Sequence, residues 1–433
     1  MKNKLDSLFF ARLFVLQAPQ SSFYRRAESE IRLAIPPTQK SVCGMEIKMK
    51  SKLRLFLPCY YAFFANGAMV LLVGVILPYI IAEAGINYSV AGGLLSAFAI
   101  GNLLASFVNP VLIGRIGRKA TIVILSALIP ISFLVITFIP PVWVMYTAFV
   151  LAGIGRGSVS IINNAVVGDN SNGKPAALNL LHMTFAFGAF LAPFLASIFI
   201  DMMELSWKAI VYAIVVAGSI STAGYALMEI DYNFPKKSEV TGREDRSFMK
   251  SVDFYAAGFL LFLYLGVENC VNGWFVTYFK SMGIMNDAYA TNLVSVTWVM
   301  VMLGRLLTAK ISGKMDKNRI ILMDCVATAV FFVLLIATKN LAVITVAIAG
   351  LGFFFAGIYP TCVSSAHNVI KGSSTGMSML LAIAALGGII TPKIVGVVAD
   401  RIGITAAIML LVVNVAGMLL LAGYRNLGSI RKK

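Results

Sequence analysis

Twelve long apolar runs constrain this chain more than any other feature of its sequence. Each is about 20 residues long, the length that an α-helix needs to cross the hydrocarbon core of a bilayer. Backbone exposed to lipid must satisfy its own hydrogen bonds, so runs of this length are helices, and the period-two alternation of a membrane barrel is not visible. The sequence therefore predicts an all-α, polytopic membrane protein with twelve transmembrane helices. The runs begin near Leu55, Ser89, Thr121, Val142, Ala176, Trp207, Val252, Ala288, Arg319, Leu341, Thr375 and Ile404.

The charges support a membrane location. Only 13% of the residues are charged, against about 25% in a soluble domain. The net charge of +17 would suit a protein that binds nucleic acid, but the positions of the basic residues along the chain do not indicate such a protein. With the N-terminus inside, the inner loops hold 22 lysines and arginines and the outer loops hold 4, which is the asymmetry of a multi-pass protein of the cell membrane with both termini cytoplasmic. We therefore expect the lipid bilayer, and no nucleic acid, as a partner.

A charged linker divides the runs into six and six. Its sequence, "DYNFPKKSEVTGREDRSFMK", has charges of both signs and few apolar residues, as expected for a solvated cytoplasmic segment. Residues 1–44 differ in character from the rest, and we expect the native protein to start at Met45, where a basic flank leads into the first run; a surface-lying amphipathic leader is the alternative. The predicted parts are an extension (1–50), a first six-helix bundle (51–230), the linker (231–251), a second bundle (252–425) and a cytoplasmic tail (426–433).

The two halves echo each other along the sequence. "GAFLAPFLASIFID" ends the fifth run and "GGIITPKIVGVVAD" ends the eleventh, so that Gly188, Pro193 and Asp201 match residues 199 positions later. Arg115 and Lys314 keep the same offset, and "GIGRG" from Gly153 matches "GLGFFFAG" from Gly350 at an offset of 197. A parallel repeat of two six-helix bundles is typical of transporters, with the substrate site between the halves near the bilayer midplane.

The loop after the second run, "PVLIGRIGRK", resembles the G-x-L-x-D-R-x-G-R-K loop of the major facilitator superfamily. The resemblance covers residues 50–425 and implies that superfamily's fold. Gly117 and the basic end are kept, whereas Pro110 replaces the first glycine and Gly114 the aspartate. A narrower resemblance is carried by "FLYLGVENCVNGWFVTYF", "WVMVMLGRLLTAKISGKM", "GIYPTCVSSA" and "GGIITPKIVGVVADRIG". These pieces are similar to the fucose–proton symporter family, which includes glucose/mannose transporters.

This chain lacks two acids that the narrower family carries. The family has an aspartate in helix 1, four residues before a proline, and here that position is Gly74. It also has a glutamate in helix 4, four residues before an asparagine, and here the positions are Val159 and Ser160. Proton coupling is therefore not implied by the resemblance.

Arg156 and Glu268 lie deep inside apolar runs. A lone charge in hydrocarbon is costly, so both side chains are expected to face a cavity or each other. In the superfamily, helices 1, 4, 7 and 10 line the central cavity, which would place the two residues opposite one another. We expect Glu268 to accept hydrogen bonds from substrate hydroxyls and Arg156 to donate them; the alternative is an ion pair that only joins the helices.

Other polar residues extend this predicted site. Trp274 is expected to stack on a sugar ring, and Asn163 and Asn164 are either cavity residues or helix-packing amides. Glu268 and His182 are the candidates to carry a coupling proton, a contact between helices being the alternative for His182. The predicted substrate-binding residues are Glu268, Asn269, Asn272, Trp274, Arg156, Asn163, Asn164 and Asn66. Lys393 is expected to reach toward the interface.

A further set is expected to act in gating. Arg305 is expected to pair with Asp316 or a helix C-terminus, and Pro360 to bend its helix. The predicted gating or structural residues are Arg115, Gly117, Arg118, Arg305, Asp316, Pro193, Pro360 and Pro392.

The sequence favours a secondary transporter of a small polar solute, most simply a sugar, working by alternating access. The resemblance to the superfamily implies a monomer. The alternatives are uptake of a uronate-like organic anion, using Arg156 and Lys393, or export of amphipathic compounds. An enzyme is not expected, because no nucleophile elbow, phosphate loop or metal-ligand spacing is visible and the cysteines show no pairing pattern. No cofactor is predicted other than a proton or sodium ion for coupling.

Overall fold

The computed structural model describes residues 37–171, 175–228, 247–370 and 373–431. The chain divides into two compact units, Met1–Phe56 and Leu57–Lys433. Of the first unit the structure describes only the start of helix α3, so the predicted start at Met45 is not tested and most of the predicted extension lies outside the described residues. Most of the predicted linker (231–251) lies outside them as well.

The described elements are helical throughout. They are α3 (Pro37–Ala84), α4 (Tyr88–Ile136), α5 (Val142–Asn170), α6 (Pro175–Ala196), the π-helical turn η1 (Ser197–Met202), α7 (Trp207–Leu227), the short 3₁₀ turn η2 (Ser247–Lys250), α8 (Val252–Ser281), α9 (Asp287–Ile311), α10 (Lys317–Ala337), α11 (Leu341–Ile370), α12 (Ser374–Ile402), α13 (Ile404–Met409) and α14 (Leu411–Arg431). α3 begins before the predicted boundary at residue 50, and α14 continues past the predicted end of the second bundle at residue 425.

Eleven of the described helical segments are long and apolar enough to cross a membrane. One of them, α4, has 49 residues and contains two spans, because its backbone leaves the helical conformation at Gly117 (φ 79°, ψ 167°). A positive φ is accessible to glycine at little cost, which explains why this position of the basic loop is a glycine. With α4 counted as spans 2 and 3, the described helices provide the twelve predicted spans.

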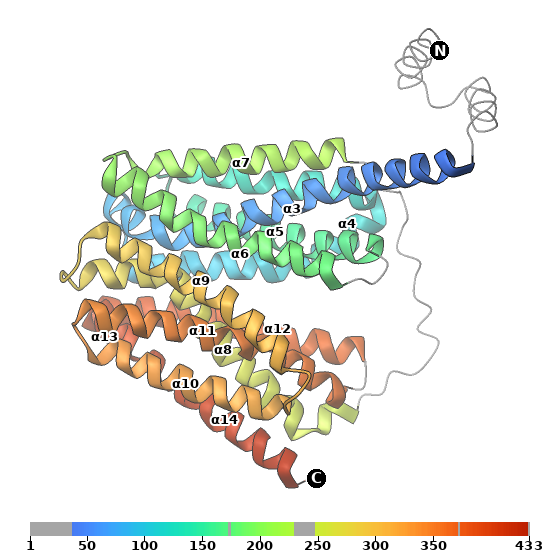
Figure 1. Cartoon of the computed structure of the whole chain (residues 1–433). Coiled ribbons are helices and arrows are strands. Elements are labelled where there is room, and N and C mark those ends of the chain that lie inside the picture. The colour runs from blue at the N-terminus through green and yellow to red at the C-terminus, as the bar shows by residue number, and fades with distance from the viewer. Residues whose placement is uncertain (1–36, 172–174, 229–246, 371–372, 432–433) are drawn as a thin grey trace. The chain divides into compact units, whose positions relative to one another are not determined.

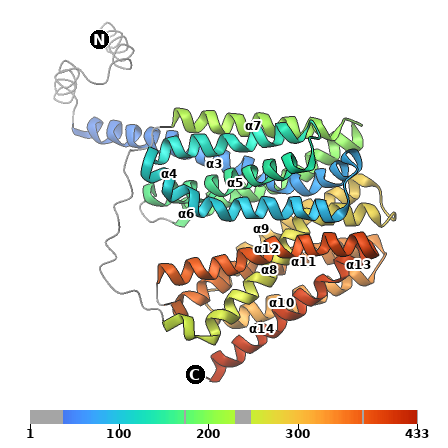
Figure 2. The same cartoon turned by 180° about the vertical axis from the view of Figure 1, so that it is seen from behind.

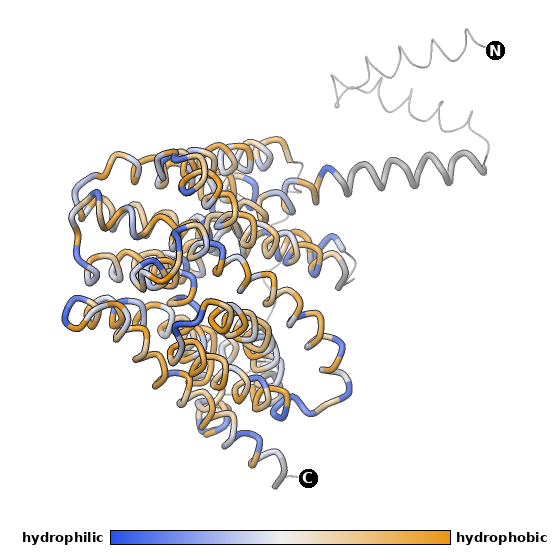
Figure 3. The backbone as a smooth tube through the Cα atoms, turned by 60° about the vertical axis from the view of Figure 1, so that its left-hand side comes forward, coloured by the Kyte–Doolittle hydropathy of each residue, from blue (hydrophilic) through white to orange (hydrophobic). Residues whose placement is uncertain are grey.

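The spans fall into two groups within the unit that begins at Leu57. Figure 1 shows α3–α7 together and α8–α14 together, and Figure 2 shows the same division from behind. The two groups meet where α4 lies against α12 and where α6 lies against α9. In Figure 3 the hydrophilic stretches gather at helix ends and turns, while the middles of the helices are mainly hydrophobic, as a bilayer requires.

Glycines set the close approach of helices in both halves. A Cβ on Gly153 would overlap the carbonyl oxygen of Phe98, and a Cβ on Gly352 would clash with that of Thr297. Both members of the second pair lie 199 residues after the first, so the structural counterpart of Gly153 is Gly352. The predicted match to Gly350, at an offset of 197, is wrong by two residues. Periodic glycines in "AGLGFFFAG" allow either alignment, and only the helix contact decides between them.

Candidate functional site

A cavity of about 660 Å³ lies between the two halves of the membrane unit. Its wall includes Asn179 and His182 of α6, Arg305 and Thr308 of α9, and Tyr359 and Ser364 of α11. The cavity lies at the end of the membrane unit that carries the loops after the even-numbered spans. The basic loop with Gly117, which follows span 2, lies at the same end. We name this end of the membrane unit the open face and the opposite end the closed face.

Glu268 of α8 is connected to this cavity through two tyrosines. The hydroxyl of Tyr264, one helical turn earlier, donates to Glu268 Oε1 at 3.2 Å. The Tyr264 ring stacks on Phe355 with centroids 4.2 Å apart and lies 5.9 Å from the ring of Tyr359, which belongs to the cavity wall. Among the described residues, none donates to the second carboxylate oxygen of Glu268. An acceptor with unused capacity therefore lies behind Tyr359 of the cavity wall and the buried Tyr264.

Two arginines act electrostatically on Glu268. They are Arg305, which lines the cavity, and Arg156 of α5. The Arg156 guanidinium lies 5.7 Å from the centroid of the Phe98 ring, and its Nε is buried without a hydrogen-bond partner. No ion pair joins Arg156 to Glu268 within the described part of the chain. The alternative of a structural Arg156–Glu268 ion pair is therefore not what this conformation shows.

Trp274 corrects one sequence-based expectation. Its side chain is fully buried, its Nε1 donates to the carbonyl of Pro392 at 3.1 Å, and its ring packs edge-on against Tyr88. It cannot stack on a substrate in this conformation. Six residues from Glu268 on the same helix, it fills the seam between halves near the closed face. Asn272 accepts from Trp298 Nε1 at 3.1 Å and also belongs to that region.

The amides of α5 have separate roles. Asn163 is fully buried, donates to the carbonyl of Cys59 at 3.2 Å and accepts from Tyr225 Oη at 2.9 Å, so it joins three helices rather than lining a cavity. Asn164 Oδ1 lies 3.1 Å from His182 Nε2. Asn163, predicted to be either a cavity residue or a packing amide, is a packing amide. His182 makes a contact between helices, which was one of its two predicted roles, and it also lines the cavity.

The remaining predicted binding residues lie at helix contacts. Asn66 of α3 is buried and donates weakly to the carbonyl of Arg156 at 3.5 Å. Asn269 points its amide at Gly388 of α12, where a Cβ would overlap its Nδ2. Neither is among the residues found in the cavity wall.

Sequence reasoning did not identify Tyr264 and Tyr359, and it placed Arg305 in a different role. The signal for Tyr264 was available, since a tyrosine four residues before an acid shares its helix face. Arg305 has no described ion pair with Asp316, which instead caps α10 by accepting from the backbone N–H groups of Asn318 and Arg319. The predicted pairing with Asp316 is therefore wrong, and the alternative of a helix C-terminus stays a prediction. Arg305 lies in the wall of the cavity as a cationic residue.

At the closed face, spans 2 and 11 are joined by several polar contacts. The Asp400 carboxylate accepts from the backbone N–H groups of Tyr88 and Ser89, both at 2.8 Å, at the start of α4. Lys393 Nζ donates to the carbonyl and hydroxyl oxygens of Ser89, and Ser96 Oγ donates to the carbonyl of Ile389 at 2.6 Å. A carboxylate at a helix N-terminus is favoured by the helix dipole, so Asp400 clamps one half to the other.

Asp201, the repeat counterpart of Asp400, lies at a second line of contact between the two halves at the closed face. Lys280 Nζ lies 3.6 Å from Asp201, 2.9 Å from Asp287 and 2.6 Å from the hydroxyl of Tyr79. Lys280 and Asp201 side chains are 12% and 8% exposed. Tyr79 and Asp201 belong to the first half, and Lys280 and Asp287 to the second. The matched aspartates at the ends of spans 5 and 11 thus hold the two seams of the closed face.

We expect Asp400→Asn to weaken this closure. Each hydrogen bond from a backbone N–H to a charged carboxylate contributes about 1.5–3 kcal/mol, so replacing it with a neutral amide should shift the closed-to-open balance of this face about tenfold. The measurement is the labelling rate of a Ser96→Cys reporter by a membrane-impermeant maleimide, with Cys43 replaced by serine. An Asp287→Asn protein is the comparison, since the described ion pair of Asp287 is with Lys280 of its own half. An unchanged rate in Asp400→Asn would contradict the clamp.

The other predicted gating residues lie near the open face or inside helices. Arg118 pairs with Asp169 at 2.7 Å, which ties the basic loop to the end of α5, while Arg115 is exposed. Pro193, Pro360 and Pro392 lie inside α6, α11 and α12. A proline inside a helix removes one backbone hydrogen bond and favours a bend there.

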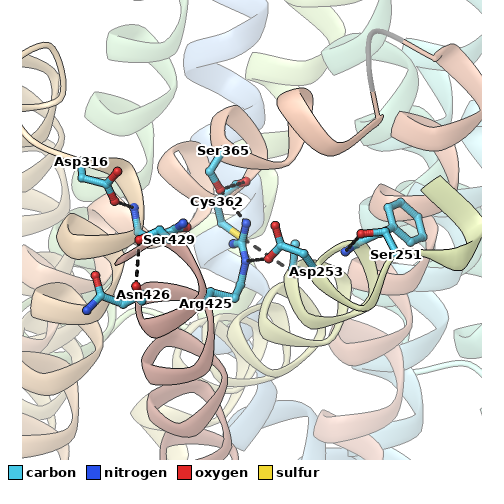
Figure 4. A network of polar contacts seen from close by, with 11 residues as sticks. Ser251, Asp253, Asp316, Cys362, Ser365, Arg425, Asn426 and Ser429 are labelled. Carbon is cyan, nitrogen blue, oxygen red and sulfur yellow. Dashed lines mark hydrogen bonds and ion pairs between the residues drawn. The ribbon is translucent and has the colours of Figure 1, made fainter. Parts of the chain in front are cut away.

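A second polar network joins three helices of the second half near the open face (Figure 4). Arg425 of α14 is almost fully buried; its Nε donates to Asp253 at 2.9 Å, and its two terminal nitrogens donate to Cys362 Sγ and Ser365 Oγ. A neighbouring cavity of about 640 Å³ includes Asp253 and Arg425 in its lining. Arg425, at the predicted end of the second bundle, is therefore an internal link between α8, α11 and α14.

Comparison with solved structures supports the fold. The nucleoside transporter NupG superimposes with a TM-score of 0.69 at 14% identity, covering 86% of this chain and 98% of that one. The fucose:proton symporter FucP of E. coli superimposes with a TM-score of 0.58 at 19% identity, with the same coverage. At these identities the likeness concerns the fold alone.

Sequence relatives extend over most of the chain. The glucose/mannose transporter GlcP of Bacillus subtilis is 25% identical over 357 residues, which are 78% of this chain and 86% of the relative. A TsgA homologue of Erwinia tasmaniensis is 24% identical over 357 residues, or 81% and 89%. The family model of the Major Facilitator Superfamily matches residues 59–379, which make up most of the membrane unit. The chain is therefore a member of the Major Facilitator Superfamily of transporters.

Proposed function

We propose that this transporter carries a hexose or a similar polyhydroxylated solute across the cell membrane by alternating access. The observation that carries the proposal is Glu268, which lies inside the membrane with one oxygen held by Tyr264 and the other without a described donor. A charged acceptor strengthens hydrogen bonds from sugar hydroxyls, and the ring of Tyr359 in the cavity wall offers an apolar face to a pyranose. The glucose/mannose transporter among the relatives supports the same substrate class.

The orientation in the membrane is part of the proposal. The cavity opens at the face of the even-numbered loops, which carry most of the basic residues, and the matched aspartates close the other face. With the basic face cytoplasmic, this conformation is inward-facing and both termini are cytoplasmic. Coupling to a proton or sodium gradient, and function as a monomer, belong to the same proposal.

An organic anion is the second candidate. Arg305 lines the cavity, and the buried Nε of Arg156 has no partner, so guanidinium groups are available for a carboxylate. Glu268 disfavours this candidate, because a second carboxylate near the same groups would repel the substrate.

Uptake into proteoliposomes distinguishes these substrates. We expect saturable uptake of a labelled hexose from a panel of glucose, mannose, galactose and fucose, with weak competition by glucuronate. Imposed proton and sodium gradients, applied separately, would identify the coupling ion. If the protein instead takes up glucuronate, ignores hexoses and loses this uptake in Arg156→Ala, the anion candidate replaces the sugar proposal.

A further inference from the structure

A second acid lies deep within the membrane unit, away from Glu268. Among the acids of the described spans, Glu268 of α8 and Asp324 of α10 are the two that lie well inside their helices; the others lie within three residues of a span end. Asp324 is 9% exposed, and its Oδ2 is buried without a hydrogen-bond partner. This acid was not among the residues that the sequence singled out.

Three helices meet at the Asp324 carboxyl group. A Cβ placed on Gly357 of α11 would overlap Asp324 Oδ2 and would lie 2.6 Å from the hydroxyl of Thr308 of α9. The missing side chain of Gly357 therefore leaves the space in which the carboxyl group and this hydroxyl lie. Thr328, one turn later on α10, is fully buried, and its hydroxyl also lacks a partner. Two buried side-chain oxygens without a hydrogen-bond partner thus lie one helical turn apart on α10.

The charged groups on the surrounding helices form no described contact with Asp324. On α9, Arg305 lies in the wall of the cavity, as does His182 of α6. On α14, Arg425 binds Asp253 and Cys362, the latter a residue of α11. Tyr359 of α11 lies toward Tyr264, and on α10 itself the adjacent Cys325 is a buried thiol. Within the described residues, no ion pair includes Asp324.

We propose that Asp324 is a proton-binding site of the transport cycle and is protonated in this conformation. An ionised carboxylate buried in a membrane without a partner is strongly disfavoured, and taking up one proton from water removes the charge by forming one O–H bond. A metal ion would need several oxygen ligands, and the described residues offer one carboxyl group and a neighbouring hydroxyl. A proton requires a single acceptor.

Two features of the position of Asp324 suit a role in transport. A proton can reach it from the cavity, and its surroundings change when α11 moves. Thr308, next to the carboxyl group, belongs to the cavity wall, so water in the cavity is one side chain away. Gly357 lies three residues before Pro360, where α11 lacks one backbone hydrogen bond and can bend. Movement of α11 during alternating access would change the space around Asp324 and hence the proton affinity of its carboxyl group.

Infrared spectroscopy of the purified protein tests the protonation directly, whatever the substrate is. At neutral pH we expect wild type to show a carboxylic-acid C=O band that is lost in Asp324→Asn and retained in Glu204→Gln, an exposed acid between spans used as the control. The Asn variant imitates the neutral acid and should fold with an unchanged Tm. A spectrum in which Asp324→Asn removes no such band would overturn the proposal.

Transport measurements test whether Asp324 couples sugar transport to a proton gradient. This second test rests on the proposed function. Asp324→Asn should retain exchange of labelled glucose across proteoliposomes but lose accumulation driven by a proton gradient, so that internal and external glucose become equal. Accumulation that persists in Asp324→Asn would overturn the coupling role while leaving sugar transport intact. Absence of any hexose exchange in wild type would instead count against the proposed function, and the infrared result would still decide whether Asp324 binds a proton.

Discussion

Glu268→Gln is expected to reduce hexose uptake, at a concentration well below saturation, by about 10- to 100-fold. The substitution keeps the shape of the side chain and its ability to accept from Tyr264, but removes the negative charge. Hydrogen bonds to a charged group contribute about 1.5–3 kcal/mol, and each 1.4 kcal/mol corresponds to a factor of ten. The measurement is the initial rate of labelled hexose uptake into proteoliposomes over a range of concentrations.

The matched control for this substitution is Glu83→Gln. Glu83 lies at the closed-face end of α3 and is held by Lys208 at 2.6 Å and by Trp207 at 2.7 Å, so the same chemical change is made away from the cavity. We expect its uptake to stay close to that of wild type. If Glu268→Gln transports hexose as well as Glu83→Gln does, Glu268 is not the substrate acceptor and the proposed site is wrong.

Gly74→Val is expected to stop the transport cycle by wedging the closed face open. Gly74 of α3 faces α8 of the other half, where a Cβ would overlap the carbonyl oxygen of Asn272 and lie 3.1 Å from the Cα of Gly273. Because these are backbone atoms, the overlap is relieved only when the two helices separate. Overpacking costs typically about 1–3 kcal/mol, so the population with this face closed should fall about 10- to 100-fold.

Two measurements follow for Gly74→Val: hexose uptake, which should be largely lost, and maleimide labelling of Ser96→Cys from the closed face, which should become faster. Gly423→Val is the control, because a Cβ on Gly423 of α14 would meet no heavy atom within 4 Å and the added side chain should be tolerated. A monodisperse elution profile shows that each variant is folded. Unchanged labelling in Gly74→Val would contradict a closed-face seam between α3 and α8.

Much of the fold could be predicted from the sequence. The predicted starts at Trp207, Val252 and Leu341 coincide with the first residues of α7, α8 and α11. Such predictions succeed because the bilayer acts on each segment by itself: an apolar run must bury its side chains in lipid and close its own hydrogen bonds. The superfamily fold, expected from the repeat and from the basic loop, is likewise confirmed by the family comparison.

The site was less predictable, for a physical reason that α8 illustrates. Glu268 and Trp274 lie in one apolar stretch, and both side chains have chemistry that suits a sugar. The structure directs Glu268 toward the tyrosines behind the cavity and seals Trp274 between Pro392 and Tyr88. Composition indicates which side chains are unusual in a membrane, but the rotation of a helix against its partners decides which of them contact water, substrate or another helix.

The sequence by itself determined that this chain spans a membrane with twelve helices in two related halves, since apolar length, basic loops and repeat spacing are properties of segments. Only the tertiary structure decided what the matched aspartates and the deep acids do. Asp201 and Asp400 became clamps because the ends of spans from opposite halves meet there, and Asp324 became a candidate proton site because three helices enclose it without a counter-charge. Partners brought together from distant parts of the chain set the roles of these charges.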